Sequence, residues 1–463
     1  MEDKKNSGSN IHRENVNPAD DYSRSRQRFR AHAPIPWHNY ASSTAVRAVE
    51  APLKEKASVI GRVGLMLLKN GTGSWRIRAA MGTVSRALGV FCTQDIGLLT
   101  ISFTCTEGSE TYTQVLSNDT TTVDVYKLHR LEQFVREFEK YYENLSVSDI
   151  HNILDEIQYE AGKYNLAVLS LAAGIACSAF AFLLGGSIPI MLGTFLGAAA
   201  GNLLRMFMRS KRVSMLACTA CGVFAACTVY SLFIRAFVAL FAVSPANEVG
   251  YICSALFVIP GFPFITSMID ISKLDMHSGF ERLLYSVQII LVATLTAWLA
   301  ALIFNLEPGI FTTYELGPVA ESSLRFAASF VGVFAFSMMF NSTWRMALFA
   351  GIIGAVSNTL RLSLASFTSL PLGVCTFIAA FVAGVLSSMV KIKVPIPRIS
   401  MTVPSTVIMI PGLYLYSAIY SLASGNTGSA AVWFADALII ILSIGFGLIA
   451  ARIVTDKRFR YYS

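Results

Sequence analysis

The pattern of apolar and polar residues divides this chain into two parts. Residues 1–163 are polar and rich in Lys, Arg, Glu and Asp, whereas from Tyr164 onward one apolar run follows another with few charges between them. Each run has about twenty residues, which is enough for a helix to span the hydrocarbon of a bilayer. The pattern therefore predicts a soluble N-terminal part followed by a membrane part that is mainly α-helical.

The polar part is expected to contain a tail and one small domain. Residues 1–45 hold too little apolar surface to fold, so we expect a disordered tail. Residues 46–163 are expected to form a cytoplasmic α+β domain. In this domain, strict alternation from Leu99 to Cys105 and a turn at 107–110 predict a strand that enters a hairpin. Apolar residues at three- and four-residue spacing predict helices at 57–69, 75–88, from Asp124 to Tyr142 and at 150–159.

Single polar residues in this domain show no pattern of catalytic chemistry. Ser74 is expected to cap the helix 75–88. His129 and His151 have no evident partner, so we expect them at the surface or at helix ends. Residues 50–160 contain no nucleophile elbow, metal-ligand cluster or paired acids, and we therefore do not expect an enzyme. A membrane-anchored sensor or enzyme that acts through this domain is the alternative hypothesis.

The apolar part is predicted to contain ten membrane spans. They cover residues 164–184, 188–207, 213–234, 250–269, 284–305, 324–343, 346–366, 370–390, 400–422 and 431–452. Basic residues gather in every second connection, as at Arg209, Lys211 and Arg212, whereas 306–322 and 423–430 carry neither Lys nor Arg. By the positive-inside rule, both termini and the soluble domain lie in the cytoplasm.

This orientation assigns the remaining segments. Residues 306–322 are expected to form an extracytoplasmic loop, and 456–463 a cytoplasmic tail. The residues before this loop and those after it, 164–305 and 323–455, then contain five spans each. An odd number of spans in each half places the second half upside down relative to the first. The sequence therefore predicts two inverted five-helix repeats.

Two short phrases support the repeat. Ile259-Pro260-Gly261 recurs 151 residues later as Ile410-Pro411-Gly412, each time inside an apolar run. A Pro-Gly pair removes a helix hydrogen bond and frees backbone groups that lipid does not satisfy, so it breaks the helix where protein or water can replace that bond. Asn202-Leu203-Leu204-Arg205 is likewise echoed by Asn358-Thr359-Leu360-Arg361. Broken helices at matching places in two halves are the best pointer in a sequence to the site of a transported substrate.

Composition and charge exclude other classes of protein. Of all residues, 54% are hydrophobic and 14% charged, against about 25% charged in soluble proteins. The net charge of +8 does not indicate nucleic-acid binding, because the basic residues cluster between spans. Cys218 and Cys221 form a C-x-x-C inside a predicted span without acidic or imidazole partners, so we expect packing there and neither a metal nor a cofactor.

Nine residues are candidates for the transport site. Pro260, Gly261, Pro411 and Gly412 would expose half-helix ends to the substrate, although Pro and Gly also merely kink membrane helices. Asn202 and Asn358 would bind substrate or pack helices together by hydrogen bonds, and Arg361 would bind a carboxylate or snorkel to the interface. Asp270 and Asp436 are the candidates for proton coupling. Asp270 is alternatively an interfacial acid that pairs with Lys273 or Arg282.

Several short segments together carry a resemblance to a known family: Ile259–Pro263 with Asp270 and Gly279–Leu283, Lys69–Gly71 and Leu128–Leu131, and Val394-Pro395 with Ile410–Gly412. Through them the chain resembles the threonine/serine exporter family over about residues 55–455. It implies an export carrier for small hydrophilic amino acids with a cytoplasmic N-terminal domain and ten spans. Some relatives in this family consist of two subunits and handle dicarboxylates such as succinate.

Together these features predict a secondary transporter that exports small amino acids such as threonine and serine. No Walker motif supplies ATP hydrolysis, so protons are the expected coupling ion. A dicarboxylate exporter and a passive channel are alternatives. The expected partners are the lipid bilayer, in the plasma membrane, and the small-molecule substrate; the oligomeric state stays open.

Overall fold

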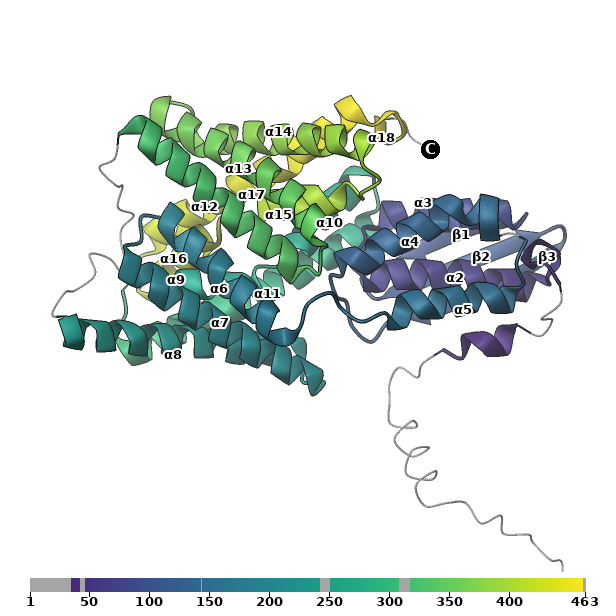
Figure 1. Cartoon of the computed structure of the whole chain (residues 1–463), viewed down its shortest axis with the longest axis horizontal. Coiled ribbons are helices and arrows are strands. Elements are labelled where there is room, and N and C mark those ends of the chain that lie inside the picture. Colours follow the sequence, from purple (N-terminus) through teal and green to yellow (C-terminus); the bar gives the residue numbers. More distant parts are fainter. Residues whose placement is uncertain (1–34, 42–45, 143, 242–249, 308–316, 461–463) are drawn as a thin grey trace, which may run out of the picture.

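A computed structural model describes residues 35–41, 46–142, 144–241, 250–307 and 317–460. It shows a small N-terminal domain with a three-stranded sheet beside a larger part made of helices (Figure 1). The chain passes from the small domain into the first long helix and returns, at its C-terminal end, to the side of the small domain. Most of the predicted tail, residues 1–34 and 42–45, lies outside the described residues.

The sheet of the N-terminal domain is an antiparallel meander. Its strands are β1 (Phe91–Ile96), β2 (Thr100–Glu107) and β3 (Glu110–Ser117) in the order β1-β2-β3. The predicted hairpin is confirmed, because β2 and β3 pair up to Glu107 and Glu110. The predicted alternation is confirmed as well, since Ile101, Phe103 and Cys105 are buried on one face.

Four helices cover this sheet or pack beside it. They are α2 (Leu53–Lys69), α3 (Ser74–Ala87), α4 (Val125–Glu137) and α5 (Val147–Tyr159), with 3-10 turns at Trp37–Tyr40 and Ala48–Glu50 and a π turn at Phe138–Tyr142. All four predicted helices are present, and Asp124 caps α4 by accepting from Lys127 N. The predicted cap of α3 was wrong by one residue. Gly73 is the N-cap and Ser74 the first helical residue, so the Ser74 side chain is free to bond elsewhere.

His151 differs most from its predicted role. It is fully buried, its Nε2 lies 3.0 Å from Ser58 Oγ, and its carbonyl accepts a hydrogen bond from Arg62. Burial first, and the neighbouring Arg62 charge second, lower the pKa of His151 to about 3. Trp37, from the segment expected to be unfolded, lies 5.7 Å from the Arg62 guanidinium and helps to cover it. His151 is therefore a core residue, and a surface or capping role is excluded.

Among the described residues of the second part, eight helices are long and apolar enough to cross a membrane. They are α6 (Leu166–Leu183), α7 (Ile188–Ser210), α8 (Met215–Phe241), α11 (Met276–Phe304), α12 (Pro318–Met339), α13 (Trp344–Phe367), α14 (Leu372–Lys393) and α17 (Thr427–Thr455). Leucines such as Leu192, Leu295 and Leu299 point outward from these helices, as expected where lipid replaces water.

Two further spans are broken. In the first, α9 (Gly250–Ser254) and a 3-10 turn (Leu256–Val258) precede α10 (Gly261–Ser272), with a bend of 59°. In the second, α15 (Ile399–Val407) precedes α16 (Gly412–Ala423), with a bend of 45°. If each bent pair is one span, the number of spans is ten. The short α18 (Lys457–Arg460) ends the described part.

The two broken spans have closely similar backbones. Pro260 and Pro411 are the N-caps of α10 and α16, with φ/ψ of −81°/58° and −81°/55°. Both following helices, α10 and α16, have 12 residues. The next long helices, α11 and α17, have 29 residues each, and the first residue of α17 lies 151 positions after that of α11. The Pro-Gly phrases therefore mark two breaks of the same geometry.

Glycines let α7 and α8 approach each other closely. A Cβ atom on Gly201 would lie 2.5 Å from the Gly222 carbonyl oxygen, and one on Gly197 would lie 2.6 Å from the Ala226 carbonyl oxygen. The row of glycines in α7 thus packs within the chain. In α8, Cys218 is buried and Cys221 exposed, and the described residues contain no cluster of side chains suited to a metal ion.

Candidate functional site

The two breaks lie directly against each other. A Cβ atom on Gly261 would lie 2.6 Å from Val407, and a Cβ atom on Gly412 would lie 2.8 Å from Ile259. Val407 lies just before the second break and Ile259 just before the first, so the glycine of each break contacts the segment that precedes the other. A small apolar cavity of about 40 Å³ lies at this contact. Only glycine allows the two bent chains to come this close.

A larger cavity of about 150 Å³ lies between the first break and the N-terminal domain. Pro260 and Gly261 form part of its wall, together with Asn202 of α7. Its other polar lining residues include Thr121, Thr122, Arg205, Arg209, Arg282 and Tyr285. The described residues that line it include three arginines and neither Asp nor Glu. The cavity therefore favours a ligand that carries negative charge.

Arg282 connects this cavity to a buried acid. It lies in the second turn of α11 and its side chain is buried. Its guanidinium donates to the Thr72 carbonyl at 2.8 Å and to Ser278 Oγ at 3.0 Å, and Nε lies 3.5 Å from Asp270 Oδ2. The same side chain thus faces the cavity and holds the carboxylate of α10. A planar guanidinium is suited to share its donors between two partners in this way.

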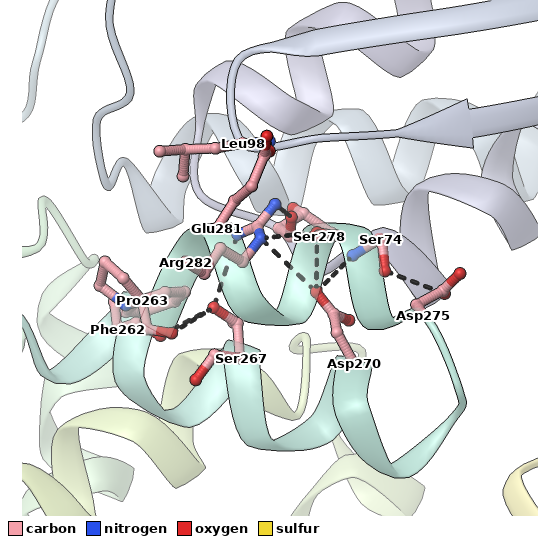
Figure 2. A network of polar contacts seen from close by, with 12 residues as sticks. Ser74, Leu98, Phe262, Pro263, Ser267, Asp270, Asp275, Ser278, Glu281 and Arg282 are labelled. Carbon is pink, nitrogen blue, oxygen red and sulfur yellow. Dashed lines mark hydrogen bonds and ion pairs between the residues drawn. The ribbon is translucent and has the colours of Figure 1, made fainter. Parts of the chain in front are cut away.

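Asp270 forms the centre of a network between the two parts of the chain (Figure 2). Its Oδ2 accepts from the backbone N–H of Ser74 at 3.1 Å and from Ser278 Oγ at 3.2 Å. Asp270 therefore caps α3 of the N-terminal domain from outside. Its Oδ1 is buried without a hydrogen-bond partner among the described residues. A Cβ atom on Gly73 would lie 2.9 Å from this oxygen, so only glycine fits there.

Further contacts hold the turn between α10 and α11 to the N-terminal domain. Ser74 Oγ donates to Asp275 at 2.9 Å, and Arg78 forms an ion pair with Asp275. The backbone N–H of Leu98 donates to Glu281 at 2.5 Å, as Figure 2 also shows. The N-terminal domain is thus bound to both sides of the Asp270–Arg282 pair. Any movement of α10 relative to this domain must break these contacts.

The structure brings only some of the predicted site residues together. Pro260, Gly261 and Asn202 line the larger cavity, and Asp270 reaches it through Arg282. Gly412 lines the small cavity beside Pro411, at the second break. Asn202 donates to the Leu169 carbonyl of α6 at 3.2 Å, which is a packing bond between helices.

Asn358, Arg361 and Asp436 lie away from the larger cavity. Arg361 Nε donates to Asn358 Oδ1 at 3.1 Å, and Asn358 donates to Ser329 Oγ of α12 at 2.8 Å. Asp436 is exposed on α17, nine residues after the start of this helix. Of the two partners expected for Asp270, the ion pair among the described residues is with Arg282. The prediction that Asp270 couples protons stays a prediction.

Three functional candidates were not among the predicted site residues. Arg205 and Arg209 line the larger cavity from α7, and Arg282 lines it from α11. The predicted fifth span began at residue 284, which left Arg282 in a loop, whereas α11 begins at Met276. The available signal was the segment Gly279–Leu283, whose arginine lies in the second turn of the observed helix. The fold around Thr72 then buries it.

These helices define the chain as an integral multi-pass membrane protein. Residues 58–304 match the family described as "Putative threonine/serine exporter", and residues 325–454 match the family described as "Threonine/Serine exporter, ThrE". The chain therefore belongs to the threonine/serine exporter family. This membership points to a membrane exporter rather than to an enzyme.

One relative has a more specific description. The chain is 23% identical over 219 residues to a protein of Klebsiella aerogenes described as "Probable succinate transporter subunit YjjP". The matched region covers 47% of this chain and 82% of that protein. No solved structure matches the chain significantly.

Proposed function

We propose that the protein is a proton-coupled secondary carrier that exports a small metabolite bearing a carboxylate. The observation that carries this proposal is the position of Arg282, which faces the larger cavity and at the same time pairs with the buried Asp270. A carboxylate is common to threonine, serine and succinate, so each of them presents a group that Arg282 can bind.

The pair also suggests how protons take part. When a substrate carboxylate reaches Arg282, it competes with Asp270 for the guanidinium. A buried carboxylate that loses its cation is costly, and taking up a proton removes that cost. We infer that Asp270 binds a proton as Arg282 turns to the substrate and releases it when the pair forms again. Asp436 is exposed on α17 and we assign it no part in this exchange.

The membrane part is proposed to work as two inverted five-helix repeats. The equal lengths of α10 and α16 and of α11 and α17, and the matching dihedral angles at Pro260 and Pro411, support a duplicated unit. In such folds, one repeat rocks against the other around a site formed by the broken helices. The two breaks contact each other at Gly261 and at Gly412, and we expect the repeats to move against each other at this contact.

The charge of the cavity bears on the class of substrate. Three arginines and no acid line it among the described residues, so a dianion is favoured over a zwitterion whose ammonium group needs an acceptor. We therefore rank a succinate-like dicarboxylate before threonine and serine, in accord with the description of the Klebsiella aerogenes relative. Arg361 and Asn358, which pair on the other half of the chain, are proposed as the matching contact in the alternate state.

The orientation follows the distribution of basic residues. We propose that the N-terminal domain and the C-terminal residues face the cytoplasm, because the connections on that side carry Lys and Arg. In this orientation the larger cavity lies at the cytoplasmic side, where an exporter takes up its substrate. The plasma membrane is the proposed location.

Transport assays in proteoliposomes test the proposal. Labelled succinate, threonine and serine are offered to the same preparation, with and without a pH gradient. We expect succinate transport that slows when the gradient is collapsed, and we expect Arg282→Gln to remove it. Arg345→Gln is the control, because Arg345 is an exposed arginine at the start of α13. Equal transport with and without the gradient would remove proton coupling, and transport of threonine but not succinate would reverse the ranking.

A further inference from the structure

A second group of cations lies at the contact between the helical part and the N-terminal domain. Its five members are Arg76, Lys273, Lys391, Arg398 and Arg452, which we call the interface cations. Arg452 interacts electrostatically with each of the other four. None of the five lines the larger cavity. Cations gathered in this way repel one another unless an anion lies between them.

The interface cations come from five different elements. Arg76 is in the first turn of α3, Lys391 in the last turn of α14 and Arg452 in the last turn of α17. Arg398 immediately precedes α15, and Lys273 immediately follows α10. Figure 1 shows the end of α14 and α18 on the side of the helical part that faces α3. The group thus lies where several spans end.

Arg452 is buried beside two aromatic rings. Its side chain is 5% exposed, and its guanidinium lies 5.4 Å from the Trp75 ring and 5.1 Å from the Phe459 ring. Within the described part of the chain this guanidinium donates no hydrogen bond and forms no ion pair. Cation–π contacts replace only part of the hydration that a buried guanidinium loses. Its five N–H donors are therefore available for a ligand.

Arg398 is buried with neutral acceptors. It is 3% exposed and donates to the Gly384 carbonyl at 2.9 Å and to Thr455 Oγ1 at 3.1 Å. Its Nε is buried without a partner, and so is Ser400 Oγ two residues later, among the described residues. Buried donors without acceptors are rare in folded proteins, and each one calls for a ligand, a water molecule or an ion.

The carboxylates nearby do not balance this charge. Glu132 of α4 forms an ion pair with Arg76, and Asp456 follows α17. Asp270, which pairs with Arg282, also interacts electrostatically with Arg452. These three acids stand against the five interface cations. The excess charge lies on the two buried arginines and on Lys391, whose side chain is exposed and gives access from outside. The group thus combines excess positive charge with buried donors that have no acceptor among the described residues, and Lys391 is its exposed member.

We propose that Arg398 and Arg452 bind a phosphate group, with Lys391 at the entrance. A tetrahedral phosphate offers several oxygens to guanidinium donors from two directions, which suits arginines on different helices. The site lies at the ends of the spans, where basic pockets between helices meet the headgroups of anionic lipids. A lipid headgroup and a free phosphate share this chemistry, and the experiment separates them.

The test uses the full-length protein in nanodiscs and follows its thermal unfolding. In one arm, phosphatidylglycerol is added in steps to phosphatidylcholine; in the other, inorganic phosphate is added to pure phosphatidylcholine discs. We expect one of these ligands to raise the unfolding temperature of the wild type. Arg398→Gln and Arg452→Gln should each weaken the apparent affinity about tenfold. A response only to phosphatidylglycerol identifies a lipid, and a response to inorganic phosphate identifies the free anion.

Two further variants keep the test decisive. Lys391→Gln changes an exposed side chain that folding does not require, and we expect it to weaken the affinity about threefold. Arg345→Gln removes an equivalent exposed charge from the start of α13 and should leave the affinity unchanged. If no ligand shifts the unfolding temperature, or if all variants shift as the wild type does, the phosphate site does not exist.

Discussion

The first and second breaks share a backbone but differ in chemistry. At each break, a proline is the N-cap of a helix of 12 residues. The first break adjoins a cavity with three arginines and leads to the buried Asp270. The second break is followed by Ser421 and Trp433 at the positions 151 residues after Asp270 and Arg282. The cavity at the contact of the two breaks, which Gly412 also lines, is small and apolar.

This difference separates two requirements of a carrier. The glycines and prolines determine where the helices bend, and both halves need them equally because each bend packs against the other. Charge is needed once, at the break that contacts the N-terminal domain through Ser74 and Thr72. In the proposed duplicated unit the geometry is kept in both copies, whereas the charged residues proposed for ion exchange are present in one copy.

The strongest test of the shared geometry replaces both glycines in turn. Gly261→Leu and Gly412→Leu should each lower transport at least about 100-fold, because the added side chain meets Val407 or Ile259 at the contact of the breaks. Transport is measured in proteoliposomes, with surface delivery checked by labelling. If only one of the two variants is inactive, the breaks are not equivalent in geometry.

The next test addresses the difference in charge. Arg282→Gln should lower transport about 100-fold, because it removes the proposed carboxylate-binding group and leaves Asp270 buried without its cation. Trp433→Leu, at the corresponding position of the second half, should change transport less than about threefold. The double variant Asp270→Asn with Arg282→Gln removes both charges and should fold while staying inactive. Activity in this double variant would contradict the proposed exchange.

A pH test addresses the N-terminal domain, which contacts the first break. The pKa of His151 is about 3 in the folded chain and 6.5 ordinarily. Above pH 6.5 His151 is neutral in both the folded and the unfolded chain. Below pH 6.5 it binds a proton in the unfolded chain but stays neutral in the folded chain. Stability should therefore fall as the pH drops, by about 2 kcal/mol at pH 5.

Thermal unfolding of the full-length protein between pH 7 and pH 5 checks this expectation, with His151→Gln as the comparison. The variant lacks the titrating group, so its unfolding temperature should depend less on pH than that of the wild type. The same slope in both proteins would show that His151 does not cause the loss. This measurement also keeps the pH dependence of stability apart from that of transport.

The mildest test compares the acid with its counterpart. Asp270→Asn should reduce transport driven by a pH gradient about tenfold, since the amide cannot carry a proton. Exchange of substrate at equal pH should persist in this variant. Ser421→Ala, at the matching position, should leave both rates unchanged. An Asp270→Asn protein that still responds fully to the pH gradient would place the proton elsewhere.

Much of the fold was evident from local patterns in the sequence. Alternation from Leu99 to Cys105 predicted β2, and the apolar runs predicted the eight long helices and the two bent pairs. The end of α8 and the start of α11 differ from the prediction by seven and eight residues. The Pro-Gly phrases predicted the breaks, because proline removes a helix hydrogen bond whatever surrounds it. Such features depend on neighbours in the chain, so the sequence shows them directly.

The site was only partly predictable, because its members meet through distant contacts. Asp270 was a candidate, but its capping of Ser74 joins residues 196 positions apart. His151 gave no sign of its burial, since Ser58 and Arg62 come from another helix. Arg398 and Arg452 are ordinary basic residues at span ends until packing buries them.

The sequence by itself thus determined the spans, the two breaks and the membrane class, which follow from local hydrophobicity and backbone restriction. Only the tertiary structure decided that the first break adjoins a cationic cavity, that Arg282 joins this cavity to Asp270, and that the N-terminal domain is fastened to this pair. The reason is physical: the environment of a charge depends on which segments fold around it, and that information is spread over the whole chain.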